Sequence, residues 1–572
     1  MRMQSSVRDE RAPSRGVSVT RRGLFVLTGS AAVLLAASCG EDPDRTTWTR
    51  GADSLPERQV WAHMVPQGLP LSEDPQTHYG SERPLFLAPA GTPYPQLVQS
   101  QLDQARAAGL TGMQILLLED VNSGDDFVTD WMAAADPTWQ DGARGFAVAA
   151  CIQATSRSGA ESLIREYVAA AEDRPSAARI DDALVVWVYD ARALSPDDWL
   201  ACRRGLERDG IAVYIVAELR TAASQNDNAF NAAAVDPYAG LFEAVWLFDD
   251  HDFMILPDVA RWAREHDTAF AGGILPGYNR ETPNGGYVDA RATELWRSQW
   301  QLQRDAGAGW ATAVTWNDVV ERTAVQPTTD WGTTRADLTA HYAAQFRGET
   351  PPTRDPVGYV TSPQFVLEGR NVLAEGLVIN HGAEPVRVRV RVIARDEREL
   401  ASSDPVTVAA GEAGAAVLDR GVEADAGSWV YAVVDVTDGT GRRLSSTRGA
   451  PVVVYAPEDP AVPQPARRTY YSLASDRSAA FTDLVAPPPR DADARSLRLT
   501  AREPVRSLEV LHNTWPAGLA VGQRDVAYED PPQSIVGGQD VTTPAHGFTV
   551  ARVVAQDGTI AYSTLVYRRD DP

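Results

Sequence analysis

Cysteine and histidine, the residues behind disulfides and most transition-metal sites, are scarce in this sequence. Its 572 residues include three cysteines and eight histidines, without the spacing of a zinc site and without a paired-histidine motif. Cys151 falls in an expected strand and Cys202 in an expected helix, so we expect two buried free thiols, with a disulfide as the alternative. The sequence therefore predicts no metal site and no cofactor.

Positive charge and long apolar runs are also lacking. Lys and Arg together number 53 against 77 Asp and Glu, which gives a formal net charge of −24. Because nucleic acids and anionic lipids are bound by basic surfaces, we expect no nucleic-acid partner and no electrostatic adhesion to a membrane. No stretch after the N-terminal forty residues reaches the ~20 apolar residues of a membrane-spanning helix. A neutral glycan is a compatible partner, and we expect a monomer.

The N-terminal segment has the pattern of an export signal. The pair Arg21-Arg22 precedes an apolar run and resembles a twin-arginine signal. The run ends in Leu-Ala-Ala-Ser-Cys at 35–39, which resembles a lipobox, so we expect lipidation of Cys39 and a secreted lipoprotein held on the outer face of the cell envelope. Ordinary cleavage near Ala37 is the alternative. The expected divisions are a signal peptide over residues 1–38 and a polar linker over residues 39–56.

Residues 57–350 alternate short apolar runs with amphipathic stretches. The runs are nearly continuously apolar and rich in Val, Ile and aromatic residues, which is typical of parallel strands covered on both faces. Eight runs in this order predict an α/β fold, a (β/α)₈ TIM barrel. An open doubly wound sheet is the alternative, but no glycine-rich phosphate turn follows the first run. The expected strands are Val60–Met64, Met113–Leu118, Phe146–Ile152, Ala183–Tyr189, Ala212–Ala217, Ala244–Phe248, Ala269–Leu275 and Ala311–Trp316.

The chain changes character after the proline-rich segment 351–356. The run Val-Arg-Val-Arg-Val-Arg-Val at 386–392 alternates strictly, as a strand with one buried and one wet face does. Short strands separated by turn signals, without a helical period, are typical of antiparallel sandwiches. A second proline-rich segment divides this region, so we expect two all-β sandwich domains, at 357–455 and 466–572.

Carboxylates dominate the positions just after the expected barrel strands. In such a barrel, reactive groups project from the carboxyl ends of the strands. Acetal hydrolysis needs one carboxylic acid to protonate the leaving oxygen, a second carboxylate as base or nucleophile, and aromatic faces that stack on sugar rings. A single strand-terminal Asp is more often a helix cap than a catalytic group. The candidate substrate-binding residues are His63, Glu119, Asp190, Glu218, Asp249, Asp250, Tyr278, Trp316 and Asn317.

The most specific pattern is Thr-Trp-Asn-Asp-Val-Val-Glu at 315–321. It resembles the eighth-strand motif of the family 71 glycoside hydrolases, the endo-α-1,3-glucanases or mutanases, and that of the related family 99 enzymes. The Ala-His pair of the first strand and the segment 274–278 are also similar to that family, and the resemblance covers residues 57–347. It implies extracellular cleavage of an α-glucan by an inverting two-carboxylate mechanism, with Asp318 as base and Glu321 as general acid.

Two other functions stay open from the sequence alone. A catalytically inactive carbohydrate-binding protein or envelope scaffold lipoprotein would have the same domains, but would not need Asp318 and Glu321 to face a common site. A metal-dependent hydrolase using the acidic run 249–252 and His63 is a third interpretation, which the scarcity of histidine disfavours.

Overall fold

The computed structural model describes the chain from Trp48 onward, with gaps. The described residues are 48–66, 82, 84–85, 92–119, 124–142, 145–219, 230–248, 255–280, 286–459, 462 and 466–474, together with strands between 496 and 568. The predicted signal peptide and the predicted lipidation site Cys39 lie outside the described residues, as do Asp249 and Asp250.

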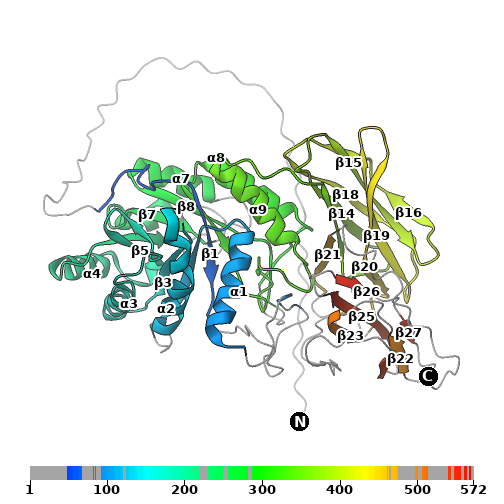
Figure 1. Ribbon diagram of the computed structural model, residues 1–572, viewed down its shortest axis with the longest axis horizontal. Coiled ribbons are helices and arrows are strands. Elements are labelled where there is room, and N and C mark those ends of the chain that lie inside the picture. Colours follow the sequence, from blue (N-terminus) through cyan, green and yellow to red (C-terminus); the bar gives the residue numbers. More distant parts are fainter. Residues whose placement is uncertain are drawn as a thin grey trace, which may run out of the picture. The chain divides into compact units, whose positions relative to one another are not determined.

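Eight parallel strands form a closed barrel (Figure 1). Hydrogen-bonded neighbours follow the order β1, β2, β3, β5, β6, β7, β8 and β11, and β11 pairs again with β1. The predicted barrel is thus confirmed, and each predicted strand is present with its ends shifted by at most two residues. The strands are β1 Gln59–Met64, β2 Gly112–Leu118, β3 Ala147–Gln153, β5 Ala183–Val188, β6 Val213–Glu218, β7 Ala244–Leu247, β8 Ala269–Ile274 and β11 Trp310–Val314, with the short β4 Arg179–Ile180 antiparallel to β5.

Amphipathic helices cover the outside of the barrel (Figure 1). Helix α4 shows the local cause, because Ser195 caps its first turn by accepting from the backbone N of Asp198, and Trp199, Cys202 and Leu206 recur on one buried face. Cys202 and Cys151 are buried free thiols, as predicted. The helices are α1 Tyr94–Ala107, α2 Gly124–Ala135, α3 Arg157–Ala170, α4 Pro196–Arg208, α6 Ala232–Val235, α7 Leu256–Glu265, α8 Glu294–Ala306 and α9 Thr334–Arg347, with 3₁₀ turns η1 Asp136–Gly142, η2 Ala191–Ala193 and η3 Asp236–Tyr238.

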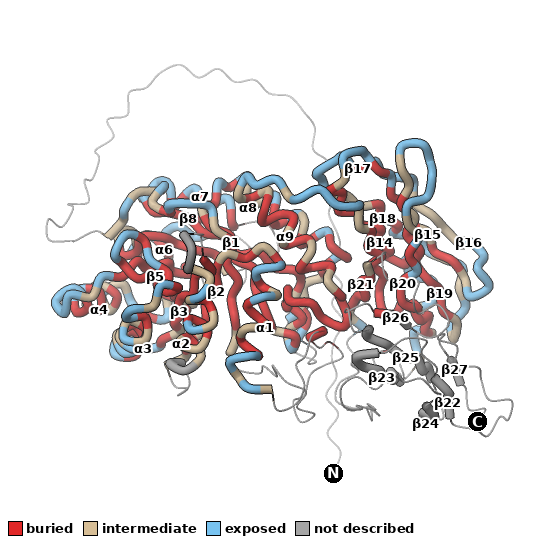
Figure 2. The backbone as a smooth tube through the Cα atoms, viewed as in Figure 1, coloured by how far each residue is buried: buried red, intermediate tan, exposed pale blue. Residues whose placement is uncertain are grey.

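The interior of the barrel is filled by tryptophans, so the barrel is a packed core and not a pore. Trp61, Trp187, Trp246 and Trp310 are almost completely buried, and neighbouring ring centroids lie 5.1–5.8 Å apart. Figure 2 shows the barrel strands buried along their length. Gly112 makes room for this packing, since a Cβ there would lie 2.6 Å from the Trp61 ring.

Residues 48–56, the second half of the predicted linker, pack against the base of the barrel, where the parallel strands begin. Leu55 belongs to the same core cluster as the interior tryptophans. The Ser54 hydroxyl lies 2.8 Å from that of Tyr214, and the backbone N of Trp48 donates to the Gly240 carbonyl at 2.9 Å. The Arg203 guanidinium stacks over the Trp48 ring at 4.7 Å. These contacts close the base, so the opposite end is the mouth.

Two sheets form the β domain that follows the barrel, and their inner faces share one valine-rich core. The alternation predicted for 386–392 is confirmed: the valines are buried, and Arg391 pairs with Asp435 at 2.7 Å on the outer face. One sheet holds β12 Val357–Pro363, β14 Asn371–Ile379, β18 Ala413–Gly421 and β21 Tyr470–Ala474; the other holds β13 Phe365–Leu367, β15 Val386–Ala394, β16 Glu399–Ser402, β17 Val406–Val408, β19 Trp429–Asp438 and β20 Arg443–Tyr455.

Strand β21 extends this domain beyond residue 455, where we expected it to end. It pairs with β12 along its whole length, from Pro363 against Tyr470 to Tyr359 against Ala474.

Among the described residues, no helix is both long and apolar enough to cross a bilayer. The remaining strands make antiparallel pairs: β22 Ser496–Leu499 with β24 Gln539–Thr542, and β23 Val505–His512, β26 Ile560–Tyr562 and β27 Val566–Arg568 with β25 Gly547–Ala555.

Candidate active site

The loop that follows β11 folds back on itself at the mouth of the barrel. The backbone N of Thr315 donates to the Thr323 carbonyl at 3.1 Å, and that of Val325 donates to the Thr315 carbonyl at 3.0 Å. Beside it, the backbone N of Trp316 donates to the His63 carbonyl at 2.7 Å, which continues the pairing of β11 with β1. The segment 315–326 is therefore an ordered platform. We call it the reactive loop.

Trp316 and Asn317, two of the predicted substrate-binding residues, hold this loop to the barrel. The Trp316 indole is fully buried and donates to Gln101 Oε1 of α1 at 2.8 Å. The Asn317 amide exchanges two hydrogen bonds, each 3.0 Å long, with the backbone N–H and carbonyl of Val65. Both side chains are thus engaged within the protein.

Asp318 is partly buried and lies at the centre of the loop. Its Oδ1 accepts from the backbone N of Glu321 at 2.8 Å, and its own backbone N donates to Thr315 Oγ1 at 2.9 Å. Burial raises the pKa of Asp318, against the opposing effect of backbone N–H donors and of the Arg280 charge. A carboxylate with a raised pKa takes up and releases a proton closer to neutral pH, as a general base should.

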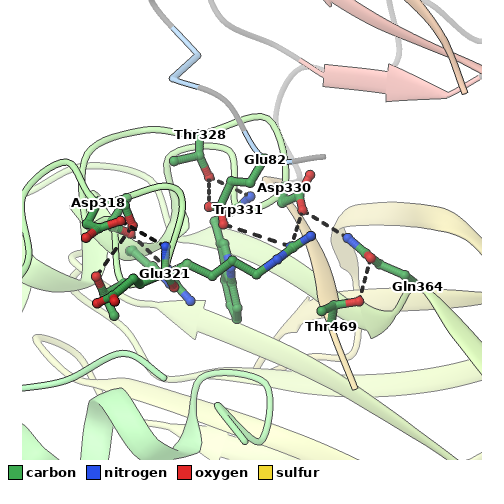
Figure 3. Close-up of polar contacts among 12 residues, drawn as sticks. Glu82, Asp318, Glu321, Thr328, Asp330, Trp331, Gln364 and Thr469 are labelled. Carbon is green, nitrogen blue, oxygen red and sulfur yellow. Dashed lines mark hydrogen bonds and ion pairs between the residues drawn. The ribbon is translucent and has the colours of Figure 1, made fainter. Parts of the chain in front are cut away.

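Glu321 lies three residues further along the loop, with its side chain about one-third exposed (31 %). Tyr278 donates its hydroxyl to Glu321 Oε1 at 2.8 Å, and Arg280 Nη1 lies 4.0 Å from the same oxygen. Burial, followed by the neighbouring Glu321, raises the pKa of Tyr278, so the phenol stays a donor. The structure thus brings three predicted residues together: Tyr278, Asp318 and Glu321 (Figure 3 shows the two acids).

Tyr278 and Arg280 come from a short hairpin after β8. The strands β9 Tyr278–Asn279 and β10 Tyr287–Val288 pair antiparallel. The backbone N of Asn279 donates to the Glu321 carbonyl at 2.9 Å, which ties the hairpin to the reactive loop. We did not predict Arg280 from the sequence. The signal for it was its spacing of two residues from Tyr278, because residues two apart on an extended segment face the same side.

His63 and Glu218 lie on barrel strands and are almost completely buried, 2 % and 3 % exposed. The His63 ring sits among aromatic side chains, at 5.2 Å between centroids from Phe248 and 6.2 Å from Tyr189. Burial lowers the pKa of His63 to about 4, so the imidazole is neutral at physiological pH. The charge of Glu218 adds to burial in raising the pKa of the Cys151 thiol.

Glu119 and Asp190 stand at other strand ends, apart from the two acids of the reactive loop. The Glu119 carboxylate accepts from the backbone N–H groups of Thr155 at 2.6 Å and Ser156 at 3.1 Å, and from both hydroxyls, at the start of α3. These bonds lower its pKa. Asp190 has a left-handed backbone, φ 50°, where β5 turns into η2. Asp249 and Asp250 lie outside the described residues.

No cluster of three or more His, Cys, Asp or Glu side chains that could hold a metal ion lies in the described part of the chain. The side chains that meet at the reactive loop are two carboxyl groups, a phenol and a guanidinium. Such a set can transfer protons to and from a bound substrate and a water molecule.

Comparison with known proteins yields similarity in structure only. No family model matches the chain, and no curated protein sequence matches it. Among solved structures, a glycoside hydrolase family 99 endo-α-mannosidase from Bacteroides thetaiotaomicron is similar with a TM-score of 0.41 and 12% identity, over 51% of this chain and 99% of that one. A glycosyl hydrolase family 2 member from Bacteroides cellulosilyticus gives 0.39 and 9%, over 89% and 61%. At these values the similarity bears on neither substrate nor site residues.

Proposed function

We propose that this chain is an extracellular glycoside hydrolase that cleaves an α-glucan by a single-displacement, inverting mechanism. The observation that carries the proposal is the placement of Asp318 and Glu321 on one hydrogen-bonded loop at the mouth of a closed barrel, with Tyr278 donating to Glu321. In barrels of this type the mouth is where catalysis takes place.

The two carboxyl groups take different roles. Glu321 is the general acid: it gives its proton to the glycosidic oxygen as the bond from that oxygen to the anomeric carbon breaks. Asp318 is the base: it removes a proton from a water molecule, whose oxygen forms the new bond to the anomeric carbon from the opposite face. The hydroxyl of Tyr278 fixes Oε1 of Glu321 and so orients the acid. The step consumes only water: its hydroxyl group joins the anomeric carbon and its proton goes to Asp318. Asp318 then releases a proton to solvent and Glu321 takes one up from solvent, which restores both groups.

A panel of soluble and insoluble α-glucans, β-glucans and mannans tests the activity. We expect new reducing ends from an α-glucan, α-1,3-linked in the first place, and ¹H NMR of the first products should show inversion of the anomeric centre. Products of retained configuration would contradict the mechanism. Absence of cleavage across the whole panel, together with measurable binding to one glycan, would instead support a carbohydrate-binding scaffold.

The cellular location is a separate part of the proposal, supported by the sequence at 21–39 alone. We propose that the chain is exported and anchored to the envelope through lipid on Cys39. Metabolic labelling with a radioactive fatty acid tests this in the native host. The wild-type chain should carry label and Cys39→Ser should not; equal labelling of both would contradict the assignment.

A further inference from the structure

Arg322 follows Glu321 directly, and both its side chain and its backbone carbonyl are bound by other residues. Its backbone is left-handed, φ 57°, and its side chain is buried in an ion pair with Asp330, Nη1 to Oδ2 at 2.8 Å, with Glu82 4.0 Å away. Its carbonyl accepts from Arg335 Nη1 at 3.0 Å. The backbone next to Glu321 is therefore held by a buried guanidinium.

Asp330, the partner of Arg322, is held in turn by the β domain. Its Oδ2 accepts from Gln364 Nε2 at 3.0 Å, and its backbone carbonyl accepts from the backbone N of Ser472 at 2.8 Å. Gln364 lies between β12 and β13, and its other amide atom, Oε1, accepts from the Thr469 hydroxyl. Figure 3 shows the contacts of Gln364 with Asp330 and Thr469, with Glu321 in the same view. Asp330 and Gln364 are both fully buried, so the loss of the Gln364 amide removes one of the hydrogen bonds that hold the buried carboxylate in place.

The same part of the β domain also holds the hairpin that carries Tyr278. Arg467 Nη1 donates to Asn279 Oδ1 at 3.2 Å, to the Arg280 carbonyl at 3.0 Å and to the Gly286 carbonyl at 3.2 Å. Its guanidinium lies 5.5 Å from the centre of the Tyr287 ring. The segment 467–469 thus contacts both structures that meet at Glu321. It contacts the hairpin directly, and it reaches the reactive loop through Gln364.

We propose that the β domain is part of the catalytic apparatus, with Gln364 as a positioning residue that acts on Glu321 through Asp330 and Arg322. This inference rests on the proposed function, because it concerns the acid of that reaction. Positioning matters because a displacement of about 1 Å in a catalytic group can cost about 100-fold in rate. The β domain contacts no substrate in this role; it fixes the geometry of a group that does.

The rival explanation is that Gln364 only stabilises the contact between barrel and β domain. Tyr359 supplies a matched control, since its buried hydroxyl also donates across this contact, to Asp337 Oδ2 of α9 at 2.9 Å, without touching the reactive loop. Gln364→Met keeps the length of the side chain and removes the amide. Tyr359→Phe removes one hydroxyl. Each variant of the full chain loses one hydrogen bond to a barrel carboxylate, and Gln364→Met also removes the acceptor of the Thr469 hydroxyl.

Two measurements on both variants test the proposal. Hydrogen–deuterium exchange of peptides covering 315–326 should speed up at least about fivefold in Gln364→Met and stay as in the wild type in Tyr359→Phe. With the glycan that the substrate panel identifies, Gln364→Met should lower kcat about tenfold with KM unchanged within about twofold, and Tyr359→Phe should leave both unchanged.

The outcomes separate the two proposals. Equal exchange of the loop in both variants, or a loss of thermal stability in Gln364→Met without a change in kcat, would overturn the positioning role. If the wild type cleaves no glycan, the proposed function fails, and the exchange measurement still decides whether Gln364 orders the loop. A Gln364→Met chain that does not fold is replaced by Gln364→Glu, which keeps the size and places a second carboxylate against Asp330; unchanged loop exchange in that variant would also overturn the proposal.

Discussion

Two glutamates follow strands of the same barrel, and their surroundings differ. Glu119, after β2, accepts hydrogen bonds from the backbone and hydroxyls of Thr155 and Ser156, so its carboxylate is used to start α3. Glu321, after β11, is met by a phenol and a more distant guanidinium, and about one-third of its side chain is exposed. A position at the strand end is thus not enough to predict a catalytic carboxylate. What differs is the set of groups that bind it: backbone N–H groups and hydroxyls at Glu119, and a phenol and a guanidinium at Glu321.

The largest expected effect on activity comes from the same Glu→Gln substitution made at both positions. Glu321→Gln should lower kcat about 1000-fold, because an amide cannot donate the proton that the leaving oxygen needs. Glu119→Gln should stay within about twofold of the wild type, since its effect is on the start of α3. Reducing-end assays on the cleaved glucan measure both. Similar losses in the two variants would remove the distinction drawn between the two sites.

Asp318 and Glu119 also differ in the direction of their pKa shifts, which is upward for Asp318 and downward for Glu119. Burial raises the pKa of Asp318, and a base must be ionised, so kcat/KM should fall as pH decreases through a midpoint above about 4, the ordinary value for Asp. Asp318→Asn should lower kcat/KM about 100-fold and abolish that acidic limb. A limb that persists unchanged in the Asn variant would assign it to another group.

A substitution of Tyr278 should have a smaller effect, and it tests whether the phenol at Glu321 contributes to catalysis. Tyr278→Phe removes the hydroxyl that holds Oε1, and we expect kcat to fall about tenfold, in the range measured for single hydrogen bonds to charged groups. Tyr238→Phe is the matched control, because its hydroxyl donates to the Leu194 carbonyl at 2.9 Å, elsewhere in the barrel. Equal kcat values for the two variants would show that the phenol of Tyr278 has no part in orienting the acid.

The smallest effect is on folding at the Glu119 site. Glu119→Gln should lower the free energy of unfolding by about 1 kcal/mol at neutral pH, because the hydrogen bonds from Thr155 and Ser156 lose their charged acceptor. The hydrogen bonds lower the pKa of Glu119, so this stability is present above the unfolded-state value of about 4.3 and is lost as the pH falls below it. Urea unfolding at pH 7 and pH 3.5 measures the difference, which should shrink at the lower pH. A constant difference would contradict the assignment of this stability to the ionised carboxylate of Glu119.

The barrel strands could be predicted from the sequence because each is an apolar run whose length and composition are local properties. The pair of acids at 318 and 321 could be predicted because a strand end and a short spacing place them together. The fate of Glu119 could not, because it depends on the point where α3 begins, more than thirty residues later.

Arg322 shows a second limit of the sequence. It stands next to Glu321 in the sequence, yet its left-handed backbone and buried side chain lead to an ion pair with Asp330. Glu82, Asp330 and Gln364 meet from three distant parts of the chain, and such meetings follow from packing that no local pattern records. The return of β21 to the sheet of β12 is of the same kind.

The attachment of residues 48–56 to the base of the barrel has a mechanical consequence. A pull on the chain ahead of Trp48 would enter the domain through the contacts of Trp48 with Gly240 and Arg203, at the end where the strands begin. The load would then be shared by the hydrogen bonds of the whole barrel before it reached the strand ends. Tension from the proposed lipid anchor on Cys39 would therefore enter the domain at the end opposite to the acids at the mouth.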